Sequence, residues 1–214
     1  MRNVDKLLLC FFLLHACVHT YAQGAEKADS LWHKEIALKT NVCGWAMLGA
    51  NTAIEYDITP HLSLHVPVHY SGGLDYFKET IKFRGLVLQP ELRWYPRLSK
   101  EVKNDGFYLG AHFGLGWYNF ALDGEWRYQD HNGTTPSLGG GLTLGYAVQF
   151  KRNPRWGMEF GIGGGAYSSK YDMFFNENNG PFHKTGIEEI WFGIDHVDIS
   201  FTYKWDLAKK GGKK

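Results

Sequence analysis

The sequence predicts an all-β protein, an eight-stranded antiparallel up-and-down transmembrane β-barrel. The first observation is the segment from His196 to Trp205, in which polar and apolar residues alternate without a break. Because successive side chains of a strand point to opposite faces, this period of two predicts a strand with one apolar and one polar face. The second is that seven earlier segments repeat the pattern, and a closed barrel gives every such strand a hydrogen-bonded neighbour within a membrane. The third is a composition of 16% aromatic residues with 26 glycines and 7 prolines, which favours strands.

Eight strands are expected in order along the chain. Their ranges are 35–43, 50–59, 62–70, 86–95, 107–118, 141–150, 156–165 and 190–205. The segment 107–118 has the strictest alternation, with Leu109 and Phe113 on one face and Gly110 and Gly114 on the other. Glycine weakens a strand, so its repeated use on one face indicates a narrow lumen in which glycines leave room for large neighbours.

The links between these strands divide into short and long ones. Short turns follow the second and sixth strands and a ten-residue link follows the fourth, whereas the links 71–82, 119–137 and 168–189 are long. Long and short links therefore fall at opposite ends, as in outer-membrane barrels, whose short turns face the periplasm. Aromatic residues near the strand ends, among them Trp94 and Tyr95, are expected in the girdles at the membrane interfaces.

Residues 1–22 are expected to be a signal peptide. Arg2 and Lys6 precede a short apolar run, 7–18, and small residues follow it, which is the layout of a cleaved secretory signal. The run is too short to span a bilayer comfortably. Lipidation at Cys17 is the alternative to cleavage after Ala22.

The mature chain is then expected to have three parts. These are a periplasmic N-terminal lead, 23–34, an outer-membrane barrel, 35–207, and a Lys-rich periplasmic tail, 208–214. Basic and acidic residues are equal in number after removal of 1–22, so nothing in the charge indicates nucleic-acid binding. Cys43 is the one cysteine left, which excludes an intramolecular disulfide.

The polar faces carry charged residues that would lie inside the barrel. This expected lumen network comprises Lys39, Glu55, Asp57, Glu91, Arg93 and Glu159. A hairpin centred near Met47 would place Lys39 opposite Glu55, and charges in a filled lumen must be paired. The alternative is a soluble, lipocalin-like ligand-binding barrel with an apolar interior. Eight strands enclose too little space for the many apolar residues, so the membrane barrel is favoured.

Histidines do not predict a metal site in this sequence. His61, His65 and His69 share one face, but side chains four positions apart on a strand are about 13 Å apart, too far to bind one ion. His69 and Ser71 near the outer rim leave an outer-membrane lipid-modifying enzyme as an alternative, although no Gly-x-Ser-x-Gly motif is present. We therefore expect no catalytic residue, metal or cofactor.

The link 168–189 contains an apolar cluster, Tyr171, Met173, Phe174 and Phe175. One hypothesis is that these side chains plug the barrel mouth by packing on Trp126 and Tyr128. The other is that they form a contact patch, because exposed aromatic and Met clusters often mark protein-binding surfaces.

Three short segments resemble a known family. They are Ala37-Leu38-Lys39-Thr40-Asn41, Ile54-Glu55-Tyr56, and Trp191-Phe192-Gly193 leading to Asp198-Ile199-Ser200-Phe201. They resemble the DUF3575 family of Bacteroidetes outer-membrane β-barrel proteins, which are similar to the membrane domain of OmpA. Asp29-Ser30-Leu31 is similar to a Bacteroidetes O-glycosylation signal.

The resemblance implies a cell-surface setting, often with fimbrial components, and no active site. We therefore expect a non-enzymatic protein, surrounded by outer-membrane lipid, that presents extracellular loops for adhesion or for a fimbrial partner. The pattern does not define its oligomeric state. A pore is not expected, because side chains fill the interior of an eight-stranded barrel.

Overall fold

The computed structural model describes residues 34–46, 49–75, 80–96, 105–122, 124–177 and 180–207, without the side chains of 73–75. The fold below is that of the unit Lys34–Lys214. The expected signal peptide, Cys17, Asp29-Ser30-Leu31 and the tail 208–214 lie outside the described residues. No helix in the described ranges is long and apolar enough to cross a membrane.

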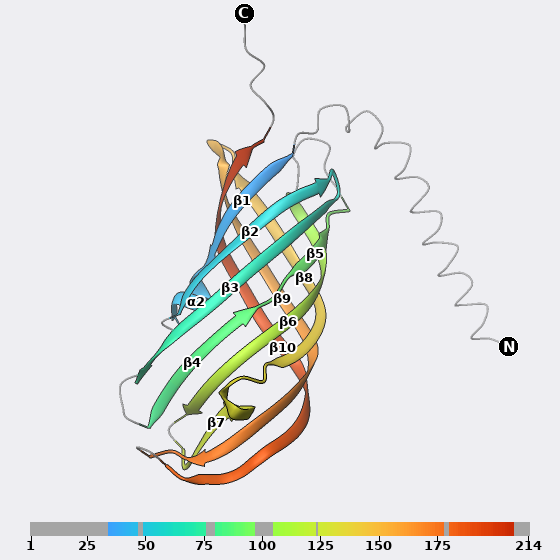
Figure 1. Cartoon of the computed structure of the whole chain (residues 1–214). Helices are drawn as coiled ribbons and strands as arrows, with labels where there is room; N and C mark the ends of the chain where they lie inside the picture. Colours follow the sequence, from blue (N-terminus) through green and yellow to red (C-terminus); the bar gives the residue numbers. More distant parts are fainter. Residues whose placement is uncertain are drawn as a thin grey trace, which may run out of the picture. The chain divides into compact units, whose positions relative to one another are not determined.

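Antiparallel strands close into a ring with eight positions (Figure 1). The elements are β1 (Glu35–Asn41), α2 (Val42–Ala46), β2 (Ala50–Thr59), β3 (Leu62–Asp75), β4 (Ile81–Leu88), β5 (Glu91–Trp94), β6 (Gly106–Leu122), β7 (Trp126–Asp130), η2 (His131–Gly133), β8 (Ser137–Phe150), β9 (Asn153–Phe175) and β10 (Phe182–Asp206). Neighbours in sequence pair around the ring, and β10 pairs back with β1. The predicted all-β, up-and-down class is confirmed.

The fourth position of the ring is shared by β4 and β5. Both strands pair with β3 on one side and with β6 on the other. The break falls at Gln89-Pro90, because proline has no N–H to donate to the ladder. The single strand expected at 86–95 is therefore two strands.

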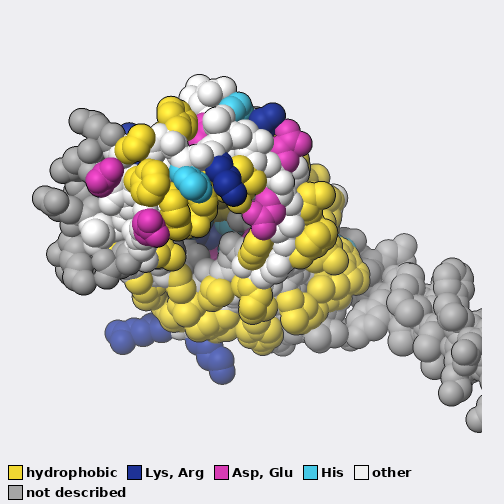
Figure 2. Space-filling view, turned by 90° about the horizontal axis from the view of Figure 1, so that it is seen from below, with side chains coloured by type: hydrophobic (Ala, Val, Ile, Leu, Met, Phe, Trp, Pro, Cys, Tyr) yellow, Lys and Arg dark blue, Asp and Glu magenta, His cyan; other side chains and the backbone are white. Residues whose placement is uncertain are grey.

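Apolar side chains cover the outer wall of the ring and polar ones line the inside. Each ring position contributes an exposed apolar side chain: Leu38, Ile54, Leu64, Leu92, Leu109, Leu144, Ile162 and Phe192. Each also contributes a buried inward one: Lys39, Glu55, Ser63, Arg93, Tyr108, Thr143, Glu159 and Ser200. The alternation of apolar and polar residues in the sequence thus corresponds to the outer and inner faces of the ring, as predicted. Seen from the end that carries the β9–β10 hairpin, the centre of the ring is hollowed (Figure 2).

The two ends of the ring differ. The tight β2–β3 and β8–β9 turns lie at one end, here called the turn end, as the short links predict. At the other, the hairpin end, β9 and β10 run on for 23 and 25 residues in all. There β7 pairs with both β6 and β9. We call β7 with residues 168–175 and 182–189 the β7–β9–β10 extension (lower part of Figure 1).

The prediction of long loops at 71–82, 119–137 and 168–189 is therefore largely wrong, because much of each segment is strand. A strand beyond the apolar belt needs no apolar outer face, so polar residues such as Lys170 and Asp172 interrupt the pattern without interrupting the strand.

The first strand is shorter than expected and ends at Asn41. The Asn41 side chain accepts the Cys43 N–H at 2.8 Å and starts helix α2.

Candidate functional site

The interior has two halves, and the half toward the turn end is filled by ion pairs. We call Lys39, Glu55, Glu91, Arg93 and Glu159 the charge network. They come from β1, β2, β5 and β9, and all five are buried. The cavity on its turn side is only about 20 Å³, too small for a ligand. This network half closes the lumen.

Arg93 is the centre of the charge network. Its Nη1 lies 2.6 Å from Glu159 Oε1 and 3.1 Å from Glu55 Oε2, and its Nη2 lies 2.9 Å from Glu91 Oε2. Lys39 Nζ pairs with both Glu55 and Glu159. A desolvated charge is tolerated only when paired and hydrogen-bonded, and each of these charges meets that condition.

Two tyrosines add hydrogen bonds to the carboxylates of Glu55 and Glu159. The Tyr95 hydroxyl donates to Glu55 at 2.8 Å, and the Tyr108 hydroxyl donates to Glu159 at 2.9 Å. The Arg93 guanidinium also lies 4.5 Å from the centre of the Tyr108 ring, a cation–π contact. Tyr95 is 1% exposed, so its expected place in an interfacial girdle is wrong.

The residues predicted to form the network lie together, and two details differ from the prediction. Lys39 faces Ala53, and Glu55 faces Ala37, so the β1–β2 register is two residues from the expected one. A two-residue shift keeps each side chain on the same face, so the ion pair still forms diagonally. Asp57 lies beside the network, where its carboxylate accepts the Glu35 N–H at 3.3 Å.

Glycines make room for these large side chains, as the sequence predicts. A Cβ at Gly110 would collide with the Glu91 carboxylate, and one at Gly145 would collide with the Tyr108 ring. The size of the lumen is thus set by pairs of a glycine and a large neighbour.

The half of the lumen toward the hairpin end is open instead. A cavity of about 470 Å³ extends from Arg93 and Asp198 to the neighbourhood of α2 and Tyr70. This size is typical of small-molecule sites. Polar side chains on its wall include Asn51, His69 and Gln89. We call this part the cavity half.

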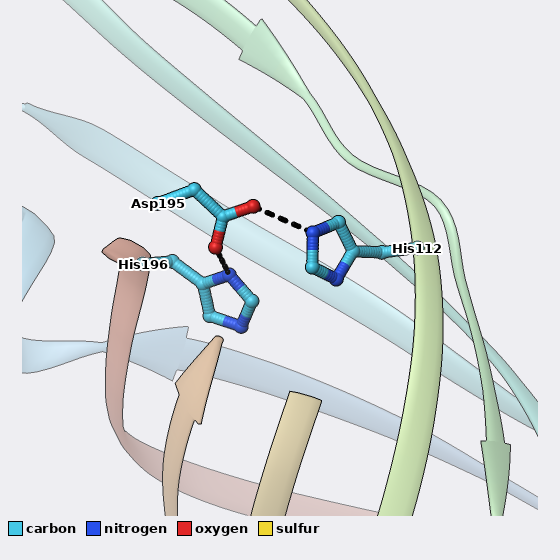
Figure 3. A group of neighbouring side chains, drawn as sticks. All are labelled: His112, Asp195 and His196. Carbon is cyan, nitrogen blue, oxygen red and sulfur yellow. Dashed lines mark hydrogen bonds and ion pairs between the residues drawn. The ribbon is translucent and has the colours of Figure 1, made fainter. Parts of the chain in front are cut away.

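A cluster of His112, Asp195 and His196 lies in the cavity half (Figure 3). His112 Nε2 lies 2.6 Å from Asp195 Oδ2, and His196 Nδ1 lies 2.9 Å from Asp195 Oδ1. The ring centroids of the two histidines are 5.1 Å apart. Sequence reasoning placed His112 and His196 on polar faces but did not bring them together with Asp195.

A β-bulge in β10 creates this cluster. Ile194 pairs with Gly164 and His196 with Gly163, so Asp195 is an extra residue without a register partner. Consecutive strand residues normally face opposite sides, but the extra residue lets Asp195 and His196 both reach the lumen.

The histidines at positions 61, 65 and 69 lie apart from one another, as their spacing predicts. His61 Nδ1 lies 3.0 Å from the Tyr95 carbonyl oxygen, His65 Nδ1 lies 3.3 Å from Glu91 Oε2, and His69 lines the cavity. The Ser71 hydroxyl donates to the Phe83 carbonyl at 3.1 Å.

The apolar cluster of the expected contact patch lies in the β7–β9–β10 extension, on a strand and not in a loop. Its members Tyr171, Met173, Phe174 and Phe175 are half-buried. The rings of Phe175 and Trp126 are 4.8 Å apart, and those of Tyr171 and Tyr128 are 5.9 Å apart. The cluster therefore packs on the two β7 residues named in the plug hypothesis, but as part of a sheet.

These features define a class: small antiparallel β-rings with an apolar outside, an interior that is closed by ion pairs in one half and open in the other, and a sheet extension at one end. The chain belongs to a family whose model is described as "Protein of unknown function (DUF3575)" and matches residues 8–205. The predicted family membership is thus confirmed. No curated protein and no solved structure matches the chain.

Proposed function

We propose that the protein is a non-enzymatic outer-membrane β-barrel that presents the β7–β9–β10 extension to other surface components. The observation that carries the proposal is the outer wall, where an exposed apolar side chain comes from every ring position while the charges lie inside. An apolar belt of this extent is unfavourable in water and favourable in lipid.

The interior favours a closed barrel over a pore. The charge network joins four strands across the lumen, with Arg93 bound to three carboxylates. An ion would have to displace buried, mutually paired charges to pass. A soluble lipocalin-like barrel would instead need an apolar inside and a polar outside.

The extension is the part that would stand clear of the membrane. Its strands continue past the belt, and charged residues such as Lys170 and Glu188 pair on it at 2.9 Å. It would face outside the cell if the turn end faces the periplasm, as in barrels of this class. A rigid sheet keeps its surface preorganised for a partner, in adhesion or in fimbrial assembly.

Membrane insertion and orientation can be tested in one experiment. In a Cys43→Ser background, Lys184→Cys places a thiol on the extension and Lys151→Cys places one in the β8–β9 turn; both sites are exposed. A membrane-impermeant maleimide should label residue 184 in intact cells and residue 151 only after lysis. Unboiled and boiled samples should also migrate differently on a gel. Labelling of residue 151 alone in intact cells would indicate the opposite orientation. Recovery of the protein in the soluble fraction would contradict the membrane proposal.

The role of the extension needs its own test. Residues 172–186 can be replaced by Asn-Gly, because Tyr171 and Ile187 are paired and Asn-Gly suits a two-residue hairpin turn. The shortened protein should keep its heat-dependent migration, while adherence and surface fimbriation of the cells should fall. Unchanged adherence and fimbriation in cells that carry the shortened barrel would contradict the proposed presentation role.

A further inference from the structure

The orientation of the two imidazoles singles out the cluster in the cavity half. The Thr143 hydroxyl lies 3.1 Å from His112 Nδ1 and 3.4 Å from His196 Nε2, so it holds one nitrogen of each ring. The other two nitrogens, His112 Nε2 and His196 Nδ1, both face Asp195. Metal-binding histidines commonly have the nitrogen opposite the metal fixed in this way by an outer hydrogen bond.

The carboxylate of Asp195 is held as well. The Tyr167 hydroxyl donates to its Oδ2 at 3.0 Å, and the Gln89 amide nitrogen lies 3.4 Å from the same oxygen. The same amide nitrogen lies 3.2 Å from His196 Nδ1, which it must release when an ion binds. Such outer contacts fix a ligating carboxylate and tune its affinity for metal.

Glycines provide the space for this arrangement. A Cβ at Gly163 would collide with the His196 ring, and one at Gly139 or Gly114 would collide with the Tyr167 ring. Three strands thus lack side chains where the cluster and its outer contacts lie. The bulge at Asp195 adds a second backbone adaptation at the same place.

We infer that His112, Asp195 and His196 bind one divalent transition-metal ion of the zinc class. Two imidazole nitrogens and one carboxylate oxygen are a usual zinc ligand set, and these atoms lie within 4.8 Å of one another. Bonds of about 2.0–2.1 Å at tetrahedral angles require ligand atoms about 3.3 Å apart. At present His112 Nε2 and His196 Nδ1 lie 2.6 and 2.9 Å from different oxygens of Asp195, and the ligand atoms all lie within 4.8 Å of one another. Shifts of at most about 1.5 Å between any two of them would give the spacing that the metal needs.

The fourth coordination position is left for water or for a further ligand. Asp195 and His196 line the 470 Å³ cavity, so an ion has a route to the site and an exchangeable ligand has room beside it. The metal would link β6 to β10 across the cavity half, much as Arg93 links strands across the network half. This inference does not depend on membrane insertion or on the extension.

The test is metal binding to the purified chain carrying an affinity tag free of histidine. Calorimetry should show one Zn²⁺ per chain, and Co²⁺ should give the visible absorption of a tetrahedral site without a thiolate band. Asp195→Asn and His196→Gln should each weaken Zn²⁺ binding by about tenfold or more, because metal sites lose about this much even from outer contacts. Thr143→Val should weaken it to a smaller extent.

Matched controls separate this site from other donors. His131→Gln removes a histidine outside the cluster, and Cys43→Ser removes the cysteine that lines the cavity; both variants should bind Zn²⁺ as the parent does. In the parent protein itself, Zn²⁺ should protect His196, but not His131, from diethylpyrocarbonate, because the side chains of both are about equally exposed. This measurement needs no variant that could fail to fold. Absence of stoichiometric binding, or unchanged affinity in both Asp195→Asn and His196→Gln, would overturn the inference, and so would lack of protection.

Discussion

The network half and the cavity half of the lumen place polar side chains in different ways. In the network half, Arg93 and Lys39 pair with carboxylates at direct contact and leave little free volume. In the cavity half, Asp195 bridges two histidines beside a large cavity. Both halves arise from the same inward face of the same ring.

Regular alternation and its interruption have separate roles in the two halves. Unbroken alternation places charges from β1, β2, β5 and β9 at one level, where they close the ring interior. The bulge in β10 instead brings two adjacent polar residues to one side. A filled half and an open cavity can therefore share one small ring, and the two should respond differently to substitution.

The largest effect is expected from Arg93→Met. This change leaves Glu55, Glu91 and Glu159 buried with Lys39 as their remaining network cation, and breaking a buried pair typically costs about 3–5 kcal/mol. The free energy of unfolding, measured by urea titration in detergent, should fall by about that amount, or the heat-dependent gel shift should be lost. Arg155→Met, at an exposed position near the β8–β9 turn, is the control and should change little. Equal stability of the two variants would show that the network does not hold the ring together.

A smaller effect is expected when the network half is overfilled. The methyl group of Gly145→Ala would meet the Tyr108 ring, and overpacking a filled core costs about 1–3 kcal/mol. Gly116→Ala is the matched control on the neighbouring strand, since its nearest neighbour there is Val87 at 4.0 Å. The unfolding midpoint should fall for Gly145→Ala and should be unchanged for Gly116→Ala. A stable Gly145→Ala protein would mean that the lumen is less filled than the structure indicates.

Loss of a charge in the cavity half should cost less than in the network half. Asp195→Asn keeps one acceptor oxygen and sits beside a cavity that can admit water, so about 1–2 kcal/mol is expected from the weaker hydrogen bonds. Unfolding should be followed with a chelator present, so that metal does not contribute. A loss as large as that of Arg93→Met would remove the energetic distinction between the two halves.

The sequence predicted the network half well because its residues follow strict alternation. Lys39 and Glu55 could be paired even with a two-residue error in register, since such an error does not change the face. Arg93, Glu91 and Glu159 follow from the same rule.

The cavity half could be predicted only through the bulge. Phe192 and Ile194 are exposed at even positions, whereas Val197 and Phe201 are exposed at odd ones. That change of parity requires one extra residue between Ile194 and Val197, and it is visible in the sequence. What the sequence could not show is that His112, distant along the chain, reaches this bulge across the lumen. The β7–β9–β10 extension was missed because polar residues such as Lys170 and Asp172 interrupt the alternation there, although the strand continues.

The smallest effect is expected in the extension and should be confined to it. The Asp172 carboxylate accepts the N–H of Asn132 at 3.0 Å and of Gly186 at 2.8 Å, and it lies 2.8 Å from His131 Nδ1. It therefore ties β9 to η2 and to the positive-φ Gly186, which lies at a register shift within β10. Its burial opposes ionisation, but these donors outweigh that effect and hold the pKa of the Asp172 carboxyl below its usual value.

The lowered pKa of the Asp172 carboxyl makes the stability of the extension depend on pH. The stabilising contribution of Asp172 is complete above the pKa of an unfolded aspartate, about 3.9, and is lost as the pH falls below that value toward the folded pKa. Protease cleavage within 176–181 should therefore increase below about pH 4 in the parent protein. In Asp172→Asn, cleavage should already be high at neutral pH and should change less with pH, while heat-dependent migration of the ring stays intact. If both proteins show the same cleavage at every pH, Asp172 does not hold the extension together. If the ring loses its heat-dependent migration as well, the extension is not an independent part of the barrel.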